Sequence, residues 1–445
     1  MNTRTLLGRI VDAAAGMVRS PGERRATRLA SILRTLVSQR GEASGAALAL
    51  RCVALYRALD EDGRLRFFEL LARDFSPEPG AVLAAATAYH GDPSPEHLAE
   101  LERVTEPPRQ EAFRRMNMAP GGTAALLEMR AAVQSLCRQH PALAVIDNDL
   151  THLLGSWFNR GFLRLERIDW RTSAAVLEKL ITYEAVHQIQ GFPDLKRRLE
   201  QDRRCFAFFH PVLPDEPLIF VEVAFVNEIP SAVAPILSLE SAVGDPRRAR
   251  CAVFYSITST QAGLRGISFG NFLIKQVAED LHKELPNLKI FTTLSPVPGL
   301  RAWARKELAK PRLDPELETL RATLAAALEG EAAPPGNLRE AFEGVAAWYL
   351  SREWHKDQVI DPVARFHLGN GARLERINWK ADVTPKGIAQ SFGTMVNYVY
   401  DLGDVEKNHE EYFTRHNAVC STPVERLARL IEPLMLDVRE GQAPH

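Results

Sequence analysis

Two side chains of this sequence have the chemistry to exchange a proton with a bound molecule: the Ser295 hydroxyl and the His367 imidazole. Ser295 ends the run IFTTLS and is followed by Pro296, Pro298 and Gly299, a rigid turn that would hold a hydroxyl at the exit of a strand. Serine before proline is also an ordinary turn residue. Since an imidazole titrates near neutral pH, the pair could perform general acid and base steps.

The segment around His367, DPVARFHLGNG, has two local interpretations. In one, Asp361 caps a short helix that Pro362 starts and Gly369 ends. In the other, a strand is followed by a hairpin at Asn370-Gly371. A histidine between apolar neighbours is often a structural group, so this pattern alone does not assign a role.

A glycine-bearing turn is the third chemical feature. Cys251–Ser256 is a β-branched and aromatic run typical of a strand. The turn predicted after this strand contains Gln261, Gly263 and Gly266. A turn whose backbone N–H groups open a helix suits a pyrophosphate, although such glycine spacing also occurs in plain connections. The apolar residues that follow at helical spacing, before Pro286, are Phe269, Phe272, Leu273, Val277, Leu281 and Leu285.

Three separated blocks resemble the malonyl-CoA decarboxylase family, in the family's order. They are EKLITYEAVHQIQGFPDLKRRLEQDRRCFAFFHP, QAGLRGISFGNFLIK with FTTLSPVPGL, and PVARFHLGNGARLERINWKADV. The resemblance implies a carboxy-lyase that converts malonyl-CoA to acetyl-CoA and carbon dioxide. It also implies no metal and no separate cofactor, because coenzyme A enters as part of the substrate.

The resemblance assigns roles to individual residues. Ser295 stands at the family's proton acceptor, which also contacts the substrate carboxyl end, although the same hydroxyl could instead serve only as a hydrogen-bond donor. His367 stands at the proton donor to the enolate carbon. Lys179 matches a lysine regarded as essential, although a solvated helix lysine is an equally good interpretation. Besides Ser295 and His367, the residues matching the malonyl-CoA-binding segment are Arg265, Gly266, Ile267, Ser268, Phe269, Gly270 and Asn271.

Two positions depart from the family pattern. Ser268 stands where organellar relatives tend to have glutamate, so a role of that carboxylate cannot be transferred. Ala174 stands where some relatives carry a cysteine of an interchain disulfide, so that redox regulation is not expected. The weaker polar candidates for the site are Glu184, His187, Ser256 and Gln261.

The pattern of predicted secondary structure changes near residue 158. Helical patterns with short breaks precede it, which predicts an all-α helical bundle over residues 1–158. The strand-like runs CFAFFHP, PLIFVEVAFV, RCAVFYSI and LKIFTTLS follow, with helices between them. We therefore expect an α+β protein, and the resemblance implies that residues 159–445 form an acetyltransferase-like (GNAT-type) α/β catalytic domain. In the family the helical domain mediates self-association, which implies a homo-oligomer, either a dimer or a tetramer.

Composition excludes several classes of protein. The net charge of −1 and the lack of long basic clusters argue against nucleic acid or an anionic membrane as a partner. No apolar run approaches the roughly 20 residues of a membrane span. Five scattered cysteines without a CxxC pair favour reduced thiols and a cytoplasmic enzyme.

The amino terminus, MNTRTLLGRIVDAAAGMVRS, is basic and amphipathic, as transit peptides are, but Asp12 and its helical period favour an ordinary first helix. At the other end, the chain closes with QAPH and without the peroxisomal tripeptide of some relatives.

Two alternative functions fit the same fold. One is acyl transfer from a CoA thioester to an amine, and the other is a non-catalytic CoA-binding regulator. Release of carbon dioxide without an acceptor would distinguish decarboxylation from both, and the presence of Ser295 and His367 argues against a silent protein.

Overall fold

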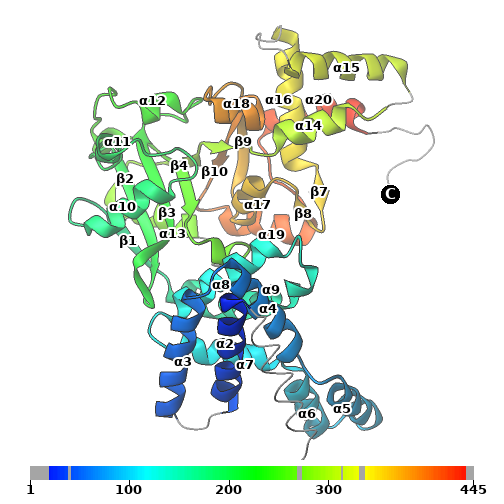
Figure 1. The fold of residues 1–445 in the computed structure, drawn as a ribbon. Coiled ribbons are helices and arrows are strands. Elements are labelled where there is room, and N and C mark those ends of the chain that lie inside the picture. Colours follow the sequence, from blue (N-terminus) through cyan, green and yellow to red (C-terminus); the bar gives the residue numbers. More distant parts are fainter. Residues whose placement is uncertain (1–19, 39–41, 268–272, 312–313, 330–335, 437–445) are drawn as a thin grey trace, which may run out of the picture. The chain divides into compact units, whose positions relative to one another are not determined.

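The computed structural model describes residues 20–38, 42–267, 273–311, 314–329 and 336–436 (Figure 1). The chain forms two compact units. The first comprises Met1–Leu163, His210–Pro214 and Gln261–Phe269, and the second comprises the remaining residues. The sequence places a domain boundary at residues 158 and 159, but it gives no sign of the two later segments that return to the first unit.

The first unit is built mainly from helices. At the start of α6 the Ser94 side chain accepts the His97 N–H and Pro95 takes the first helical position, a typical cap. The rings of Tyr56, Phe67 and Phe68 pack in its core. The helix predicted near the amino terminus lies outside the described residues. The elements are α2 (Pro21–Ser38), α3 (Glu42–Arg57), α4 (Glu61–Asp74), α5 (Pro79–Gly91), α6 (Pro95–Thr105), α7 (Pro108–Asn117), α8 (Gly122–Leu136), η1 (Pro141–Leu143), α9 (Ala144–Trp157), η2 (Arg160–Phe162) and, from the returning segment, η4 (Ala262–Leu264).

The second unit is organised around a mixed, eight-stranded sheet with the strand order β1-β2-β3-β4-β5-β10-β6, in which β9 also pairs with β10. β4 and β5 are parallel, whereas the pairs β1–β2, β3–β4, β5–β10, β6–β10 and β9–β10 are antiparallel. A separate hairpin joins β7 and β8. The strands are β1 (Arg164–Ile168), β2 (Arg203–His210), β3 (Leu213–Val226), β4 (Cys251–Ser259), β5 (Ile290–Thr293), β6 (Ser295–Pro296), β7 (Trp354–His355), β8 (Gln358–Val359), β9 (Arg373–Asn378) and β10 (Met395–Val399).

Helices bury one face of this sheet through two apolar clusters. α10 and α11 pack on β1, β2 and β3 around Leu180, Leu195 and Phe220, while Ile236 of α12 packs with Val253 of β4 and nearby strand residues. The helices of this unit are α10 (Ala174–Tyr183), α11 (Phe192–Arg198), α12 (Ala234–Leu237), η3 (Pro246–Arg248), α13 (Leu273–Glu284), α14 (Leu300–Leu308), α15 (Pro315–Glu329), α16 (Gly336–Ser351), α17 (Pro362–Gly369), α18 (Pro385–Ser391), α19 (Val405–Arg415) and α20 (Thr422–Met435).

The predicted fold class is confirmed: a helical region precedes a mixed sheet with helices, an arrangement compatible with the GNAT type. All four strand-like runs named above form strands. The helical interpretation of DPVARFHLGNG is confirmed by α17, and the hairpin interpretation is wrong. No helix in the described ranges has the length and apolar character that crossing a membrane requires.

Candidate active site

Strand divergence places Ser295. β4 and β5 pair from Cys251 with Ile290 to Phe254 with Thr293, and the pairing then stops. β4 continues to Ser259, whereas the chain after β5 turns to pair with β10 through β6. Beyond Phe254, this edge of β4 has no strand partner among the described residues. Backbone groups at such an edge can bind an extended ligand arm.

Ser295 and His367 meet directly in the second unit. Ser295 Oγ lies 3.0 Å from His367 Nε2, and the same hydroxyl donates to Thr293 Oγ1 at 2.8 Å. Only 5% of Ser295 and 3% of His367 is exposed. The sequence predicted that folding would bring these two residues together, and their distance agrees with that prediction.

Two tyrosines complete the surroundings of the imidazole. The Tyr400 hydroxyl lies 2.8 Å from His367 Nδ1, and the Tyr398 ring stacks on the imidazole with centroids 4.6 Å apart. The sequence analysis missed both, together with Thr293. A usable signal was present, because residues two apart on a strand share a face and Tyr398 and Tyr400 are spaced in this way at the end of β10.

The imidazole of His367 is uncharged in this environment. Burial lowers the pKa of His367 to about 3, because desolvation disfavours the charged form. Its close contacts are the hydroxyls of Ser295 and Tyr400 and the rings of Phe366 and Tyr398, all of them neutral groups. Burial also raises the pKa of Tyr400 well above its usual value, so its hydroxyl keeps its proton.

A buried carboxylate orients the helix that carries His367. Asp361 Oδ1 accepts two N–H groups of the first turn of α17, which confirms the predicted cap. Burial raises the pKa of Asp361, and the nearby Tyr349 phenol opposes this effect in part. Asp361 Oδ2 has no well-aligned hydrogen bond. A Cβ at Gly299 would lie 2.3 Å from the Tyr349 hydroxyl. The turn after Ser295 and the start of the His367 helix therefore meet at one tyrosine.

The glycine-bearing turn lies in the first unit, whereas the Ser295–His367 pair lies in the second. Gly266 has φ +78°, a conformation that favours glycine, and both Arg265 and Gly266 are exposed. The N–H groups of Arg265 and Ile267 donate to carbonyls within the turn. In contrast, the Gly266 N–H donates to no backbone carbonyl of the described residues. The remaining members of the predicted segment, Ser268, Phe269, Gly270 and Asn271, lie outside the described residues.

Lys179 has a different set of partners. Its Nζ donates to Glu216 Oε1 at 2.5 Å and to the Asp215 carbonyl at 2.8 Å. Within the described parts of the chain, it makes no hydrogen bond to Ser295 or His367. The structure therefore brings Ser295 and His367 together and leaves Lys179 in an ion pair at the start of β3.

Three of the four weaker candidates, Glu184, His187 and Ser256, form a buried cluster of their own, whereas Gln261 lies in the first unit. The Glu184 carboxylate accepts the Ser256 hydroxyl at 2.8 Å and the backbone N–H groups of Val186 and His187. Burial lowers the pKa of His187 to about 4. These contacts hold the loop after α10 against β4, which is a structural task.

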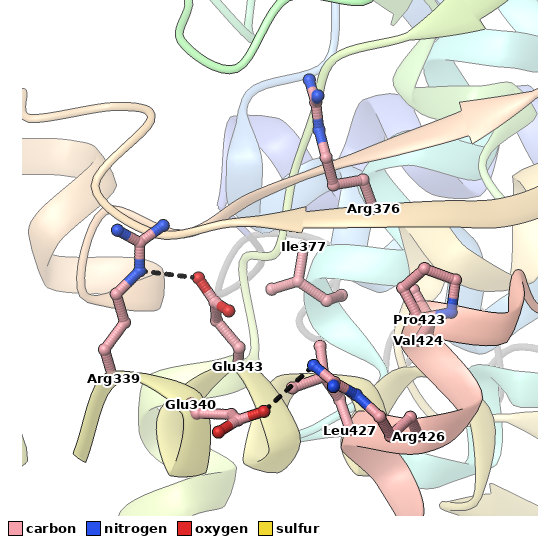
Figure 2. A pocket seen from close by; sticks show the side chains of 9 residues that line it. All are labelled: Arg339, Glu340, Glu343, Arg376, Ile377, Pro423, Val424, Arg426 and Leu427. Carbon is pink, nitrogen blue, oxygen red and sulfur yellow. Dashed lines mark hydrogen bonds and ion pairs between the residues drawn. The ribbon is translucent and has the colours of Figure 1, made fainter. Parts of the chain in front are cut away.

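A pocket of about 390 Å³ lies between α16, β9 and α20 (Figure 2). Its charged side chains are already engaged, since Arg339 pairs with Glu343 and Arg426 pairs with Glu340. Arg376 donates to backbone carbonyls and to Asn397, and in Figure 2 its guanidinium points away from both ion pairs. We assign no catalytic role to this pocket.

The second unit thus combines a buried hydroxyl–imidazole contact with a mixed sheet that is compatible with the acetyltransferase type, and comparisons with known proteins identify the family of the chain. The model of the malonyl-CoA decarboxylase C-terminal domain matches residues 161–438, and that of the N-terminal domain matches residues 75–158. The chain belongs to the malonyl-CoA decarboxylase family, a family of carboxy-lyases.

Individual relatives agree with this assignment. The mitochondrial malonyl-CoA decarboxylase of Anser anser anser is 36% identical over 407 residues, which cover 82% of this chain and 80% of that protein. The mitochondrial enzyme of Rattus norvegicus is 36% identical over 70% of this chain and 69% of its own length. The crystal structure of malonyl-CoA decarboxylase from Rhodopseudomonas palustris is similar with a TM-score of 0.85 and 49% identity, covering 90% of this chain and 99% of that one. The crystal structure of malonyl-CoA decarboxylase from Agrobacterium vitis is similar with a TM-score of 0.83 and 44% identity, covering 90% of this chain and 99% of that one.

Substitution of Gly266 tests the turn. We expect Gly266→Val to weaken CoA binding at least about tenfold, because a side chain would obstruct close approach of a phosphate to the backbone. The positive φ adds strain of about 1–2 kcal/mol. Gly191→Val is a matched control, because Gly191 has φ +94° and equally open space around its Cβ position. Calorimetric titration with CoA should separate the two variants, and equal affinities would place the phosphates elsewhere.

Proposed function

We propose that this protein is a malonyl-CoA decarboxylase that converts malonyl-CoA to acetyl-CoA and carbon dioxide. The observation that carries the proposal is the 3.0 Å contact between Ser295 and His367 at the point where β4 and β5 diverge, in a chain that belongs to this family. Release of carbon dioxide from malonyl-CoA by the purified protein, without an acceptor amine, tests it directly.

The reaction breaks one carbon–carbon bond and adds one proton. The malonyl carboxylate leaves as carbon dioxide, and the bonding electron pair passes to the α-carbon, where the thioester carbonyl delocalises it as an enolate. Protonation of that carbon gives acetyl-CoA. The protein must therefore hold the carboxylate, stabilise the oxyanion and supply the proton.

We assign the proton donor to His367 and the contact with the carboxylate to Ser295, which also acts as proton acceptor. If Ser295 donates to Thr293, the hydrogen on Nε2 of the imidazole points to Ser295 Oγ, and Nδ1 accepts the Tyr400 hydroxyl. This arrangement gives both imidazole nitrogens and the Ser295 hydroxyl a hydrogen-bond partner and points the Nε2 proton toward Ser295. Tyr400 then fixes the tautomer of the imidazole.

The substrate supplies the charge that this site lacks. The described groups in contact with the imidazole are neutral, and burial alone would keep it deprotonated at neutral pH. A malonyl carboxylate bound beside Ser295 is an anion within reach of the imidazole, and a nearby opposite charge raises the pKa of a buried base. We therefore propose that His367 takes up its proton when malonyl-CoA binds.

The remaining parts of the proposal concern binding and assembly. The segment Arg265–Asn271 binds the phosphates of malonyl-CoA, and coenzyme A is part of the substrate, not a separate cofactor. We place the protein in the cytoplasm, in keeping with the five cysteines, which are all free thiols. The first unit assembles the protein as a homo-oligomer.

The assembly proposal predicts a dimer or tetramer in light scattering at micromolar concentration. Large apolar side chains on the first unit support it, since Leu83 is 69% exposed and Met118 is 82% exposed. Replacing both with glutamate should lower the molecular mass in solution while malonyl-CoA turnover per chain continues. A full-length monomer would contradict the proposal.

Paired mutants test the two catalytic assignments. We expect His367→Asn to retain CoA binding and to lose about 10²- to 10⁴-fold in decarboxylation, the usual loss for a general acid. Ser295→Ala should also lose most turnover, and the double mutant should be little slower than either single mutant if the residues act as a unit. Losses that multiply fully would show independent roles, and near-normal turnover of His367→Asn would remove it from the mechanism.

Proton uptake with the substrate predicts a specific pH dependence. Because the free pKa lies near 3 and the bound pKa is higher, the KM of the parent protein for malonyl-CoA should fall as the pH falls from 8 to 5. Acetyl-CoA, which lacks the carboxylate, is the matched ligand. The pH dependence of its inhibition constant should reflect only the ionisation of its own phosphate. This difference in pH dependence between malonyl-CoA and acetyl-CoA should vanish in the His367→Asn variant, whose Ser295 is intact. Identical pH profiles for both ligands would mean that His367 stays neutral.

A further inference from the structure

A buried arginine of the helical region holds the glycine-bearing turn. Arg130 lies on α8 with only 3% of its surface exposed, and its Nη1 donates to the carbonyl of Gly263 at 2.7 Å. Its Nε donates to Asp147 Oδ1 on α9 at 2.9 Å. One guanidinium thus joins two helices to the segment that precedes Gly266, and all of these residues belong to the first unit.

Close backbone packing reinforces this contact. A Cβ at Gly263 would lie 2.2 Å from the carbonyl oxygen of Leu127, so only glycine lets the turn rest on α8 at this point. Leu264, the next residue, is 1% exposed. The buried side of the turn is therefore anchored at Gly263 and Leu264, while Arg265 and Gly266 face solvent.

The chemistry of the contact favours a positioning role. A guanidinium presents its donors in a rigid fork, and hydrogen bonds from a charged donor are stronger than neutral ones. Asp147 fixes the direction of that fork from the second helix. A turn that binds an anion through a backbone N–H, such as that of Gly266, binds more tightly if this N–H already points at the ligand, because ordering it on binding would reduce the affinity.

We infer that Arg130 and Asp147 are positioning residues for the CoA-binding turn, so that the helical unit sets the affinity for the phosphate-bearing end of the substrate. The inference rests on the proposed function in one respect, that this turn binds CoA. It gives the helical unit a task in addition to self-association.

The chain offers a matched control for the loss of a buried arginine. Arg109 on α7 is 5% exposed and pairs with Asp149, which lies on α9 as Asp147 does. Its other partners are the Ser76 hydroxyl and the Phe75 carbonyl. Arg109→Met therefore removes a similar buried ion pair from the same unit without removing a contact to the turn.

The test compares Arg130→Met, Arg130→Lys and Gly263→Ala with Arg109→Met in the full-length protein. For Arg130→Met we expect the Kd of CoA and the KM of malonyl-CoA to rise at least about tenfold, the equivalent of one charge-assisted hydrogen bond, with kcat within about threefold of the parent. Amide hydrogen exchange over Gln261–Ile267 should accelerate even without ligand. Arg130→Lys should recover only part of the lost affinity. Lysine keeps the positive charge, but it lacks the rigid fork that lets arginine bind Asp147 and the Gly263 carbonyl at the same time.

The outcomes separate this inference from the proposed function. Unchanged CoA affinity and exchange in Arg130→Met would overturn it, as would an equal loss of affinity in Arg109→Met. If Arg130→Met does not fold, Gly263→Ala and Arg130→Lys decide by the same two measurements. A parent protein that binds CoA but releases no carbon dioxide would defeat the proposed function and leave the positioning role standing.

Discussion

The hydrogen bond between Ser295 Oγ and His367 Nε2 is the contact on which the candidate active site depends. Its partners come from β6 and α17, so neither local segment can form it alone. Both groups are buried, and a buried polar group left without a partner costs about 1–3 kcal/mol. The strand order around β10, the cap at Asp361 and the close approach of Tyr349 to Gly299 all act to keep these two atoms within reach of each other.

The same contact explains the electrostatic character of the site. Neutral hydroxyls and aromatic rings surround the imidazole. In such a low-dielectric setting, a charge that enters with the ligand interacts more strongly with the groups around it. A site of this kind responds to an anionic ligand more strongly than a site that already contains a counter-ion. The mechanism proposed above uses this property, because the malonyl carboxylate that leaves as carbon dioxide is also the group that raises the pKa of His367 and lets it take up a proton.

Local patterns in the sequence predicted much of this. The β-branched runs gave the strands, Asp361 and Pro362 gave the start of α17, and the proline-rich turn gave the place of Ser295. Long-range pairing was not predictable from such patterns. β10 is the last strand of the described residues, yet it lies between β5 and β6, and this order brings Tyr398 and Tyr400 to the imidazole. The resemblance to a family supplied the pairing of Ser295 with His367, which spacing alone could not give.

The return of Gln261–Phe269 to the first unit has a consequence for folding during synthesis. Domains generally fold from the amino terminus as the chain emerges. Here α8 and α9 appear early, but their packing partner at Gly263 emerges only after β1 to β4 have been made. Until then the guanidinium of Arg130 has no carbonyl of the turn to bind, and the backbone of α8 at Leu127 lacks its packing partner Gly263. Completion of the helical unit is therefore a late, non-local step, and its timing is set by the synthesis of the sheet strands that interrupt it.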